Sequence, residues 1–597
     1  MSNQASPQPG SKKPTRNRQR VLGSGPSFFA QGEPMVWLTG GCLAICLIMI
    51  VSMLVYVVRM GTSTFLVSPI VEVTTLTGET YMGEPTREQT FRPGEHIFNA
   101  IPEEHQQRIR DDIEAAYGYA NRRLLRTGNA ELTGNYFTWV TDIMVAEERT
   151  PEWAVVLERL EWGRFYGIPT AFTIDGEEVA SGPAEAWAMF RRYHPEVRAR
   201  YWQRQDGEKR DIGRINRGQE QSRLRLQRQR LEHRRGTIND AQLAAAEERF
   251  EREQEEFNLQ YEKVMEPLRA LNAENARYQL ILTTADGQTK HQPMGEIVRG
   301  YAANQMGFFA SVGIYGSRWW EFIFHDPREA NMEGGVWPAI VGTVIMTLIM
   351  TVLVVPIGVL AALYLREYAK TGPVVSAVRI AINNLAGVPS IVFGVFGLGF
   401  FCYIVGGGID AFFYPERSTP VFAGGGVLWA SATLALLTLP VVIVATEEAL
   451  AAVPGSSRQG SYACGASKWQ TIRRIVLPRA MPGIMTGMIL AMARGAGEVA
   501  PLMLVGAVKL APDLPVDFSN WSGSLGWIPT GPIHMERSFM HLGFHIYDVG
   551  FQSSDSEAAR PMVFTTTMLL ISIVVVLNLL AMYLRARLKR RFAGAMF

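Results

Sequence analysis

An arginine and a glutamate interrupt an apolar run in the last quarter of the chain. Arg494 and Glu498 are the only charged residues within 480–508. Residues four apart lie on one face of a helix, and a charge at the centre of a bilayer costs roughly 2.5–3.5 kcal/mol on insertion scales. We therefore expect both side chains to face a bundle interior or a water-filled path. A guanidinium there offers a fork of donors to a tetrahedral oxyanion, and Gly495 and Gly497 let a helix or a ligand approach closely. The spacing predicts a gate for an anion.

A structural alternative exists for the same two residues. A buried ion pair can neutralise itself within one helix and merely aid packing. Pro501 follows the pair and weakens the hydrogen-bond ladder of the helix at this point. Both interpretations place Arg494 and Glu498 inside a membrane helix bundle.

Long uncharged runs are the elements that would position this pair. They cover 35–58, 334–365, 380–409, 418–446 and 561–584, and 480–508 is the sixth. Each run exceeds the roughly 20 residues that a helix needs to cross a membrane. The chain is therefore predicted to be an all-α polytopic membrane protein with six transmembrane helices. Two cysteines in the first run, Cys42 and Cys46, share a helix face and are interpreted as packing residues rather than metal ligands.

The distribution of basic residues predicts the orientation of the spans. Short basic loops are those at 12–20 (Lys12, Lys13, Arg16, Arg18, Arg20), 366–379 (Arg366, Lys370, Arg379), 458–479 (Arg458, Lys468, Arg473, Arg474, Arg479) and 585–591 (Arg585, Arg587, Lys589, Arg590, Arg591). Lys and Arg are enriched in short cytoplasmic loops, so both termini are expected in the cytoplasm. The predicted parts are a cytoplasmic tail at 1–34, a first helix at 35–58, an extracytoplasmic insertion at 59–333, a five-helix domain at 334–585 with a cytoplasmic loop at 447–482, and a cytoplasmic tail at 586–597.

The insertion is expected to be an α+β domain with a helical hairpin at about 210–273. Leu243, Phe250, Phe257, Val264 and Leu271 recur every seven residues, with Tyr261 and Leu268 between them, which predicts a coiled-coil seam. The stretch before 236–240 is arginine-rich and the stretch after it is glutamate-rich, which favours an antiparallel hairpin over a nucleic-acid surface. Residues 278–287 alternate and contain an Asp-Gly pair, which is typical of strands joined by a turn.

The cytoplasmic loop at 459–478 argues against nucleotide binding by this chain. Gly460 and Gly465 have the spacing of a phosphate-binding loop, but Ala466 stands where that motif requires a lysine. The chain is therefore predicted to be neither an enzyme nor a cofactor-binding protein. A short helix, a glycine turn and a second helix stopped by Pro478 would form a compact knob on the membrane domain.

The same loop resembles the coupling loop of ABC-transporter permeases. In that pattern Glu-Ala-Ala is followed by three residues, Gly, nine residues, Ile, any residue and Leu-Pro. Gly465, Ile475, Leu477 and Pro478 stand at the matching positions, and Gln459 replaces the glutamate. The resemblance implies that a separate ATPase docks on these residues.

The segments 385–401, 444–454 and 483–502 narrow the resemblance to the PstA-type permease subunit of phosphate ABC importers. The likeness covers about 333–597 and leaves the insertion unexplained. It carries an Arg-x-x-Gly-Glu signature onto Arg494, Gly497 and Glu498 as substrate-pathway residues. Arg458, at the inner mouth, is a second pathway candidate, with an ordinary cytoplasmic loop arginine as the alternative.

The resemblance implies a transport complex in a bacterial inner membrane. The partners would be the lipid bilayer, a second homologous permease, a dimer of ATP-binding subunits that uses the ATP, and a periplasmic phosphate-binding protein, with no nucleic acid. The alternatives are a permease for another oxyanion such as molybdate or sulfate, and a membrane-anchored sensor or scaffold that works through its coiled coil.

Two further expectations concern the path itself. Glu498 would accept a hydrogen bond from the protonated oxygen of hydrogen phosphate. Sulfate, which is fully deprotonated, would only be repelled by the carboxylate. Pro389 and Ser390 would either break a span and expose backbone amides to the path or produce a simple kink.

Overall fold

The computed structural model describes residues 33–593 except 101, 519–522, 526–527 and 554. The predicted tails therefore lie partly outside the described residues, namely 1–32 and 594–597. The chain divides into two compact units, Met1–Val58 and Arg59–Phe597. Six helices within the described residues are long and apolar enough to cross a membrane, as predicted.

The first unit is built on helix α1 (Glu33–Ser63), which continues five residues into the second unit. Its membrane-spanning part, Met35–Ser63, is longer than the predicted 35–58. Arg59 ends the uncharged run but not the helix, because the backbone hydrogen-bond ladder does not require apolar side chains. The hydroxyls of Thr39 and Ser52 donate to carbonyls three or four residues earlier, so they are satisfied within the helix.

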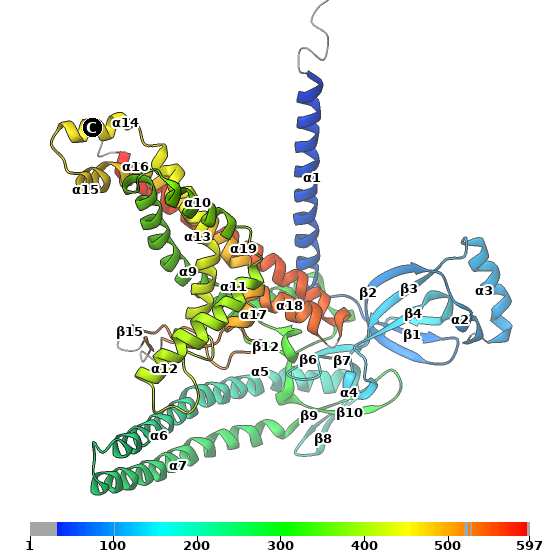
Figure 1. The fold of residues 1–597 in the computed structure, drawn as a ribbon. Coiled ribbons are helices and arrows are strands. Elements are labelled where there is room, and N and C mark those ends of the chain that lie inside the picture. Colours follow the sequence, from blue (N-terminus) through cyan, green and yellow to red (C-terminus); the bar gives the residue numbers. More distant parts are fainter. Residues whose placement is uncertain (1–32, 101, 519–522, 526–527, 554, 594–597) are drawn as a thin grey trace, which may run out of the picture. The chain divides into compact units, whose positions relative to one another are not determined.

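A five-stranded antiparallel sheet begins the inserted domain (Figure 1). Its strands are β1 (Val71–Thr75), β2 (Thr80–Phe91), β3 (Ala120–Arg126), β4 (Phe137–Thr141) and β5 (Val145–Arg149), in the order β4-β3-β2-β1-β5. The accompanying helices are α2 (Glu95–Ala100), α3 (Glu103–Ala115) and α4 (Ala130–Thr133). Val71, Val73, Leu125 and Val140 alternate along three of these strands and form the buried face of the sheet.

A second antiparallel sheet follows and carries the main core of the inserted domain. Its strands are β6 (Val155–Arg159), β7 (Arg164–Ile174), β8 (Glu177–Ser181), β9 (Tyr278–Thr283), β10 (Thr289–Pro293) and β11 (Ile297–Tyr301), in the order β10-β9-β7-β6-β11 with β8 paired to β7. Helix α5 (Pro183–Gly207) buries Trp187 and Phe190 against Leu280 and Leu282 of β9. The predicted strand pair is β9 and β10, and the α+β insertion is confirmed.

The helical hairpin consists of α6 (Gly213–Arg234) and α7 (Asp240–Ala276), which run side by side in Figure 1. Ser222 donates to Glu253 at 2.6 Å, and Arg230 forms a 2.9 Å ion pair with Glu247. The residue number at the contact rises along α6 from 222 to 230 while it falls along α7 from 253 to 247, so the two helices are antiparallel. The expected attraction between the arginine-rich and glutamate-rich stretches is present.

The seven-residue repeat of α7 is only half-buried. Leu243, Phe257 and Val264 are of intermediate exposure, and Leu268 is buried. Tyr261, the other intervening position, is 37% exposed. A coiled coil in the strict sense stays a prediction.

Helix α13 is the centre of the membrane domain. The helices here are α9 (Trp337–Leu363), α10 (Pro373–Leu385), α11 (Ser390–Phe396), α12 (Gly407–Phe413), α13 (Val427–Ala451), α14 (Gly455–Ala463), α15 (Lys468–Thr471), α16 (Leu477–Gly497), α17 (Ala500–Val505), α18 (Leu542–Tyr547) and α19 (Ser556–Ala593). Leu434 and Val442 of α13 pack with Met346 and Met350 of α9 and with Ala491 of α16. This packing holds α16, which carries the predicted gate, against the centre of the bundle.

Shorter elements connect these parts. Helix α8 (Phe308–Phe324) and the strands β12 (Pro327–Arg328) and β13 (Glu333–Gly334) link the second sheet to α9, and β14 (Gly523–Leu525) and β15 (Ile528–Gly531) follow α17. The π-helical segments are η2 (Glu208–Ile212), η6 (Tyr364–Tyr368), η7 (Gly397–Gly406), η8 (Ile472–Val476) and η9 (Asp548–Gln552), and the 3-10 turns are η1 (Asp142–Met144), η3 (Met294–Glu296), η4 (Ala303–Gln305) and η5 (Glu329–Asn331).

Three predicted spans are displaced in the structure. The predicted span 480–508 is Lys468–Gly497, the predicted span 380–409 is Ser390–Phe413, and the predicted span 418–446 is Val427–Ala451. Prolines cause the first two differences. Pro501 and Pro389 each lie at a break between two helices, and a proline ring clashes with the carbonyl four residues earlier in a continuous helix.

Candidate functional site

Arg494 and Glu498 meet at the broken end of α16. The Arg494 Nε lies 3.6 Å from Glu498 Oε1, which is close enough for an ion pair but too long for a hydrogen bond. Arg494 lies in the last helical turn, whereas Glu498 has an extended backbone just beyond it. The two side chains are 38% and 23% exposed in the isolated chain. The pair is therefore loosely held and open to a third group.

The helix break itself is set by local chemistry. Helix α16 ends at Gly497, and α17 begins at Ala500 with Pro501 in its first turn. Proline is tolerated there because no hydrogen bond from its nitrogen is needed. A positive side chain in the last turn of a helix is favoured by the partial negative charge of that end, which suits Arg494.

Three other helices surround this break. A Cβ atom placed on Gly495 would lie 2.3 Å from the sulfur of Met350 on α9, and one placed on Gly543 of α18 would lie 2.6 Å from Cγ2 of Val499. A Cβ atom on Gly497 would meet nothing within 4 Å. The two glycines predicted to allow close approach thus differ, because Gly495 admits a helix while Gly497 borders open space.

The Pro389–Ser390 break lies next to the first one. Helix α10 ends at Leu385, and α11 begins at Ser390 after a non-helical turn, so the chain has a discontinuous helix here and not a simple kink. A Cβ atom on Gly394 of α11 would lie 2.8 Å from Cα of Pro501. The second halves of two broken helices are therefore in backbone contact.

Arg458 is engaged in structural contacts. Its guanidinium forms a 3.0 Å ion pair with Glu367 in η6 and donates to the carbonyls of Leu450 and Val453 at the end of α13. The Leu450 carbonyl belongs to the last turn of α13, and Val453 follows that helix. The contacts favour a role in fastening α13 to the end of α9.

The loop at 459–478, which was predicted to be cytoplasmic, contains the predicted glycine turn. Gly465 has a φ of +79°, its amide donates to Tyr462, and the amide of Ala466 donates to Ser461. This is the Schellman arrangement that ends a helix, here α14, at a glycine in the left-handed conformation. Helix α15 then begins with a capping box formed by Ser467 and Gln470.

The expectation that Pro478 stops the second helix of the loop was wrong. Lys468–Gly497 is one continuous helical span that runs through Pro478. The π-helical segment η8 precedes the proline, and the amide of Leu477 bonds to Ile472, five residues back. The wider turn accommodates the ring, which would clash in a regular α-helix.

The remaining predicted loop residues differ in exposure. Gln459 is exposed, whereas Ile475, Leu477 and Pro478 are half-buried at the base of the loop. The most exposed large hydrophobic side chain here is Trp469. The loop thus offers an exposed tip on a packed base.

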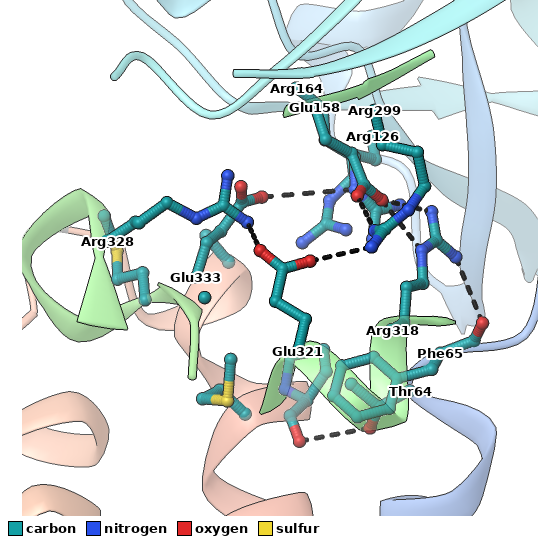
Figure 2. A pocket seen from close by; sticks show the side chains of 15 residues that line it. Thr64, Phe65, Arg126, Glu158, Arg164, Arg299, Arg318, Glu321, Arg328 and Glu333 are labelled. Carbon is teal, nitrogen blue, oxygen red and sulfur yellow. Dashed lines mark hydrogen bonds and ion pairs between the residues drawn. The ribbon is translucent and has the colours of Figure 1, made fainter. Parts of the chain in front are cut away.

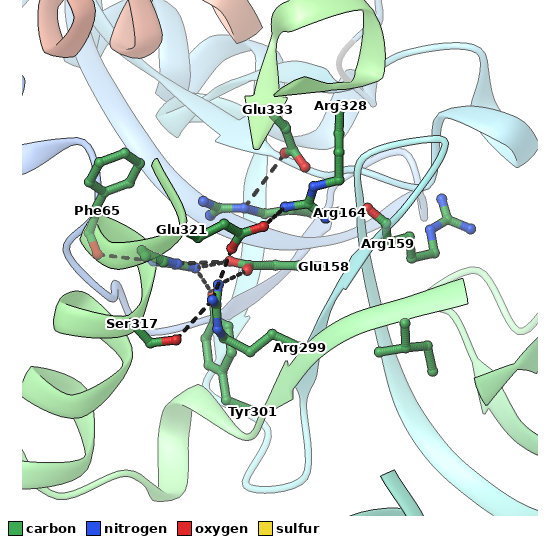
Figure 3. Close-up of polar contacts among 12 residues, drawn as sticks. Phe65, Glu158, Arg159, Arg164, Arg299, Tyr301, Ser317, Glu321, Arg328 and Glu333 are labelled. Atoms are coloured by element: carbon green, nitrogen blue, oxygen red, sulfur yellow. Dashed lines mark hydrogen bonds and ion pairs between the residues drawn. The ribbon is translucent and has the colours of Figure 1, made fainter. Parts of the chain in front are cut away.

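A buried arginine–glutamate cluster is a feature that sequence reasoning missed. Glu158 of β6 contacts Arg299 of β11 and lies 2.7 Å from Arg318 of α8, while Glu321 of α8 contacts both Arg299 and Arg328 (Figure 3). These five residues are the arginine–glutamate cluster. They come from four elements, and Glu158 is 141 residues from Arg299 in the sequence. No local pattern could have revealed that contact.

Electrostatics keep this cluster charged. Burial alone raises the pKa of the Glu158 carboxyl, but the guanidiniums of Arg318 and Arg299 outweigh that effect and hold the pKa below its usual range. Burial lowers the pKa of Arg318, and Glu158 more than compensates, so the net shift is upward. Glu158, Arg299 and Arg318 are therefore ionised and join β6, β11 and α8.

Two buried histidines were also missed. His541 directly precedes α18, and His545 lies within it. The two residues are four apart in the sequence, and both are almost fully buried. His541 Nδ1 accepts from the amide of Gly543, whereas neither ring nitrogen of His545 has a hydrogen-bond partner among the described residues. Their spacing in an apolar stretch was the available signal.

Known proteins resemble the second half of this chain. A family model described as "Binding-protein-dependent transport system inner membrane component" matches residues 336–594. The "Phosphate transport system permease protein PstA 1" of Mycobacterium tuberculosis is 39% identical over 201 residues, which cover 34% of this chain and 60% of that protein. The "Probable ABC transporter permease protein YqgI" of Bacillus subtilis is 30% identical over 295 residues, covering 49% and 92%.

A third relative matches a stretch of similar length. The "Phosphate transport system permease protein PstA 2" of Mycobacterium bovis is 31% identical over 273 residues, which cover 46% of this chain and 78% of that protein. The chain spans about 60% of the length of the first curated relatives that it matches.

Proposed function

The chain belongs to the binding-protein-dependent transport family of inner membrane components, as a PstA-type permease with an inserted domain, and from this premise we propose that it is the permease subunit of an ATP-driven importer of inorganic phosphate. It forms half of the translocation pathway, and a second homologous permease forms the other half. A periplasmic phosphate-binding protein delivers the substrate. The chain spans a bacterial inner membrane several times, with both termini in the cytoplasm.

The observation that carries this proposal is the ion pair at the break of α16. Arg494 and Glu498 are 3.6 Å apart without a hydrogen bond, and Gly497 borders open space. Phosphate can therefore replace the glutamate as the partner of the guanidinium without breaking a strong bond. An arginine binds such an oxyanion through two parallel N–H donors.

Glu498 gives the gate its selectivity in this proposal. Its carboxylate accepts a hydrogen bond from the protonated oxygen of hydrogen phosphate. It repels sulfate, which has no proton to donate at neutral pH. The extended backbone of Glu498 frees this side chain from the helix face, because it lies beyond the last turn of α16.

The cytoplasmic loop connects this gate to ATP hydrolysis by partner subunits. A dimer of ATP-binding subunits docks on the exposed tip around Gln459, Gly465 and Trp469. Because the helix is continuous from Lys468 to Gly497, a displacement of the tip is transmitted along one rigid rod to Arg494. Closure of the ATPase thus re-aims the guanidinium. Arg458 supports this motion by anchoring α13 and is only secondarily a pathway residue.

The test is uptake of radiolabelled phosphate by a phosphate-starved host that lacks its own permease subunit and expresses this chain with its partners. Arg494→Ala is compared with Arg379→Ala. The Arg379–Glu447 ion pair has nearly the same separation, 3.5 Å, and its side chains are 42% and 22% exposed. We expect Arg494→Ala to abolish uptake and Arg379→Ala to retain it at equal membrane abundance.

Two results would contradict the proposal. Equal uptake by both variants would make the Arg494 pair structural, and no uptake by the native chain would remove phosphate as substrate. Glu498→Gln tests selectivity separately. An unchanged preference for phosphate over sulfate in this variant would refute the role given to Glu498.

A further inference from the structure

A pocket lies beside the arginine–glutamate cluster and contains more positive than negative charge. Its volume is about 60 Å³, and it is lined by five arginines (Arg126, Arg164, Arg299, Arg318, Arg328) and three glutamates (Glu158, Glu321, Glu333) (Figure 2). We call it the arginine pocket. The lining carries two more positive than negative side chains, and Glu84 outside the lining pairs with Arg164. The remaining excess of one positive charge favours an anion.

Two of the arginines have donors that the protein leaves unused. The guanidinium of Arg126 stacks over Phe137 at 5.2 Å, and no acceptor or carboxylate pairs with it among the described residues. The Nε of Arg164 is buried without a hydrogen bond, since Glu333 Oε1 is 4.0 Å away. A buried donor without an acceptor is costly, so the Nε of Arg164 calls for an additional acceptor. Arg126 is half-buried beside it, and its donors can reach the same acceptor.

Three of the five arginines, including Arg164, are held rigidly. Arg299 lies between Glu158 and Glu321, and Arg318 also donates to the carbonyl of Phe65 at 3.0 Å. Arg164 is fixed by a 2.8 Å bond to Glu84. Guanidiniums that are already immobilised lose little entropy when a ligand binds. The pocket is therefore preorganised.

The size of the pocket suits a small oxyanion. A cavity needs roughly 10–15 Å³ for one water, so about 60 Å³ has room for several waters or for a central atom with four oxygens. The pocket also contains a carboxylate, Glu333, whose only partner among the described residues is the distant Nε of Arg164. A carboxylate in an anion site favours an anion that can donate a proton.

We propose that the arginine pocket is a second oxyanion site, which binds hydrogen phosphate outside the membrane and separately from Arg494 and Glu498. The choice of phosphate rests on the proposed function, whereas oxyanion binding as such does not. Arg126 and Arg164 donate hydrogen bonds to the anion oxygens, and Glu333 accepts a hydrogen bond from the protonated oxygen of the phosphate. The pocket wall also includes Pro561 of α19, so a bound anion ties the inserted domain to a membrane helix.

The test is equilibrium binding of radiolabelled inorganic phosphate to the purified full-length chain in phosphatidylcholine nanodiscs, without partner subunits. Arg126→Gln is compared with Arg122→Gln. Arg122 lies four residues earlier on β3 and so on the same face, bonds to Gln89, and does not line the pocket. We expect phosphate affinity to fall about tenfold or more in Arg126→Gln, the loss of one charge-assisted hydrogen bond, and to persist in Arg122→Gln and Arg494→Ala.

Glu333→Gln gives a result that misfolding cannot imitate. Removing the negative charge should raise sulfate affinity and narrow the preference for phosphate by about tenfold, because the repulsion of a fully deprotonated anion disappears. An unchanged phosphate-to-sulfate ratio would overturn the role of Glu333. Thermal stability measured with and without phosphate reports whether each variant is folded and still binds.

Other outcomes would overturn the site itself. Binding that is lost in Arg494→Ala but retained in Arg126→Gln belongs to the gate, and undetectable binding by the native chain removes the site. A lipid headgroup carries the same phosphate chemistry, so binding is repeated with phosphatidic acid in the nanodisc. Competition by that lipid would assign the pocket to a headgroup. Arg126-dependent binding in a chain that fails to import phosphate would sustain the pocket and refute the transport function.

Discussion

Acidification should destabilise this protein through its two buried histidines. Burial lowers the pKa of both His541 and His545 from 6.5 to about 4. For His545, the nearby Asp548 raises the pKa and Lys509 lowers it, but burial dominates. The unfolded chain therefore takes up protons first as the pH falls, and the folded chain stays neutral. The stabilisation is complete above pH 6.5 and is lost progressively between pH 6.5 and 4.

The magnitude follows from these shifts. A pKa difference of about 2.5 units corresponds to roughly 3.4 kcal/mol per histidine, of which about 2 kcal/mol is lost by pH 5. The two histidines together should lower the free energy of unfolding by about 4 kcal/mol between pH 7 and pH 5. Both side chains are at least 98% buried, so solvent screening reduces this only slightly.

The assay is denaturant unfolding of the full-length chain in detergent, followed by tryptophan fluorescence at pH 7 and pH 5. His545→Leu removes one buried titrating group, and neither ring nitrogen of His545 is hydrogen-bonded. We expect this variant to lose about 2 kcal/mol less than the native chain between the two pH values. His291→Leu, at an exposed position on β10, should behave like the native chain. An equal pH dependence in His545→Leu and the native chain would refute the reasoning.

Three other substitutions test the packing described above. Arg318→Met leaves a buried glutamate short of one partner and should lower the free energy of unfolding by about 3–5 kcal/mol, and a near-neutral result would contradict an ionised cluster. Gly394→Val forces a side chain against Pro501 and should cost about 1–3 kcal/mol, whereas Gly399→Val, which meets open space, should cost less in the same denaturation assay. Gly465→Ala meets no neighbour but keeps a φ of +79°, so it should cost only about 1–2 kcal/mol and reduce ATPase stimulation by the assembled complex.

Local patterns were sufficient for much of the fold. The six spans could be predicted because a membrane helix depends only on about 20 consecutive apolar residues. The glycine turn at Gly465 and the opposite charges of α6 and α7 were likewise visible, because each depends on residues that are close in sequence or on two adjacent helices. The proximity of Arg494 and Glu498 was expected from their spacing of four within one helix. The structure brings them together although Glu498 lies beyond the last turn of α16.

Helix boundaries were less accessible to sequence reasoning. At Pro501 the sequence predicted only a weakened backbone hydrogen-bond ladder, not the helix break after Gly497. The sequence also predicted that the helix stops at Pro478, whereas it continues through that proline. Whether a proline ends a helix depends on its neighbours, since a π-helical turn such as η8 accommodates the ring and a regular α-helical turn does not. That choice is made by packing around the helix and is not encoded in the proline.

The sequence by itself determined the spans, the hairpin and the candidate gate, because short-range periodicity and charge are sufficient to specify them. Only the tertiary structure decided that Arg458 pairs with Glu367, that two broken helices meet at Gly394 and Pro501, and that five arginines converge on one pocket. The residues of that pocket are separated by up to several hundred positions. No local pattern reports such proximity, because it arises from the way in which the two sheets, α8 and α19 pack together.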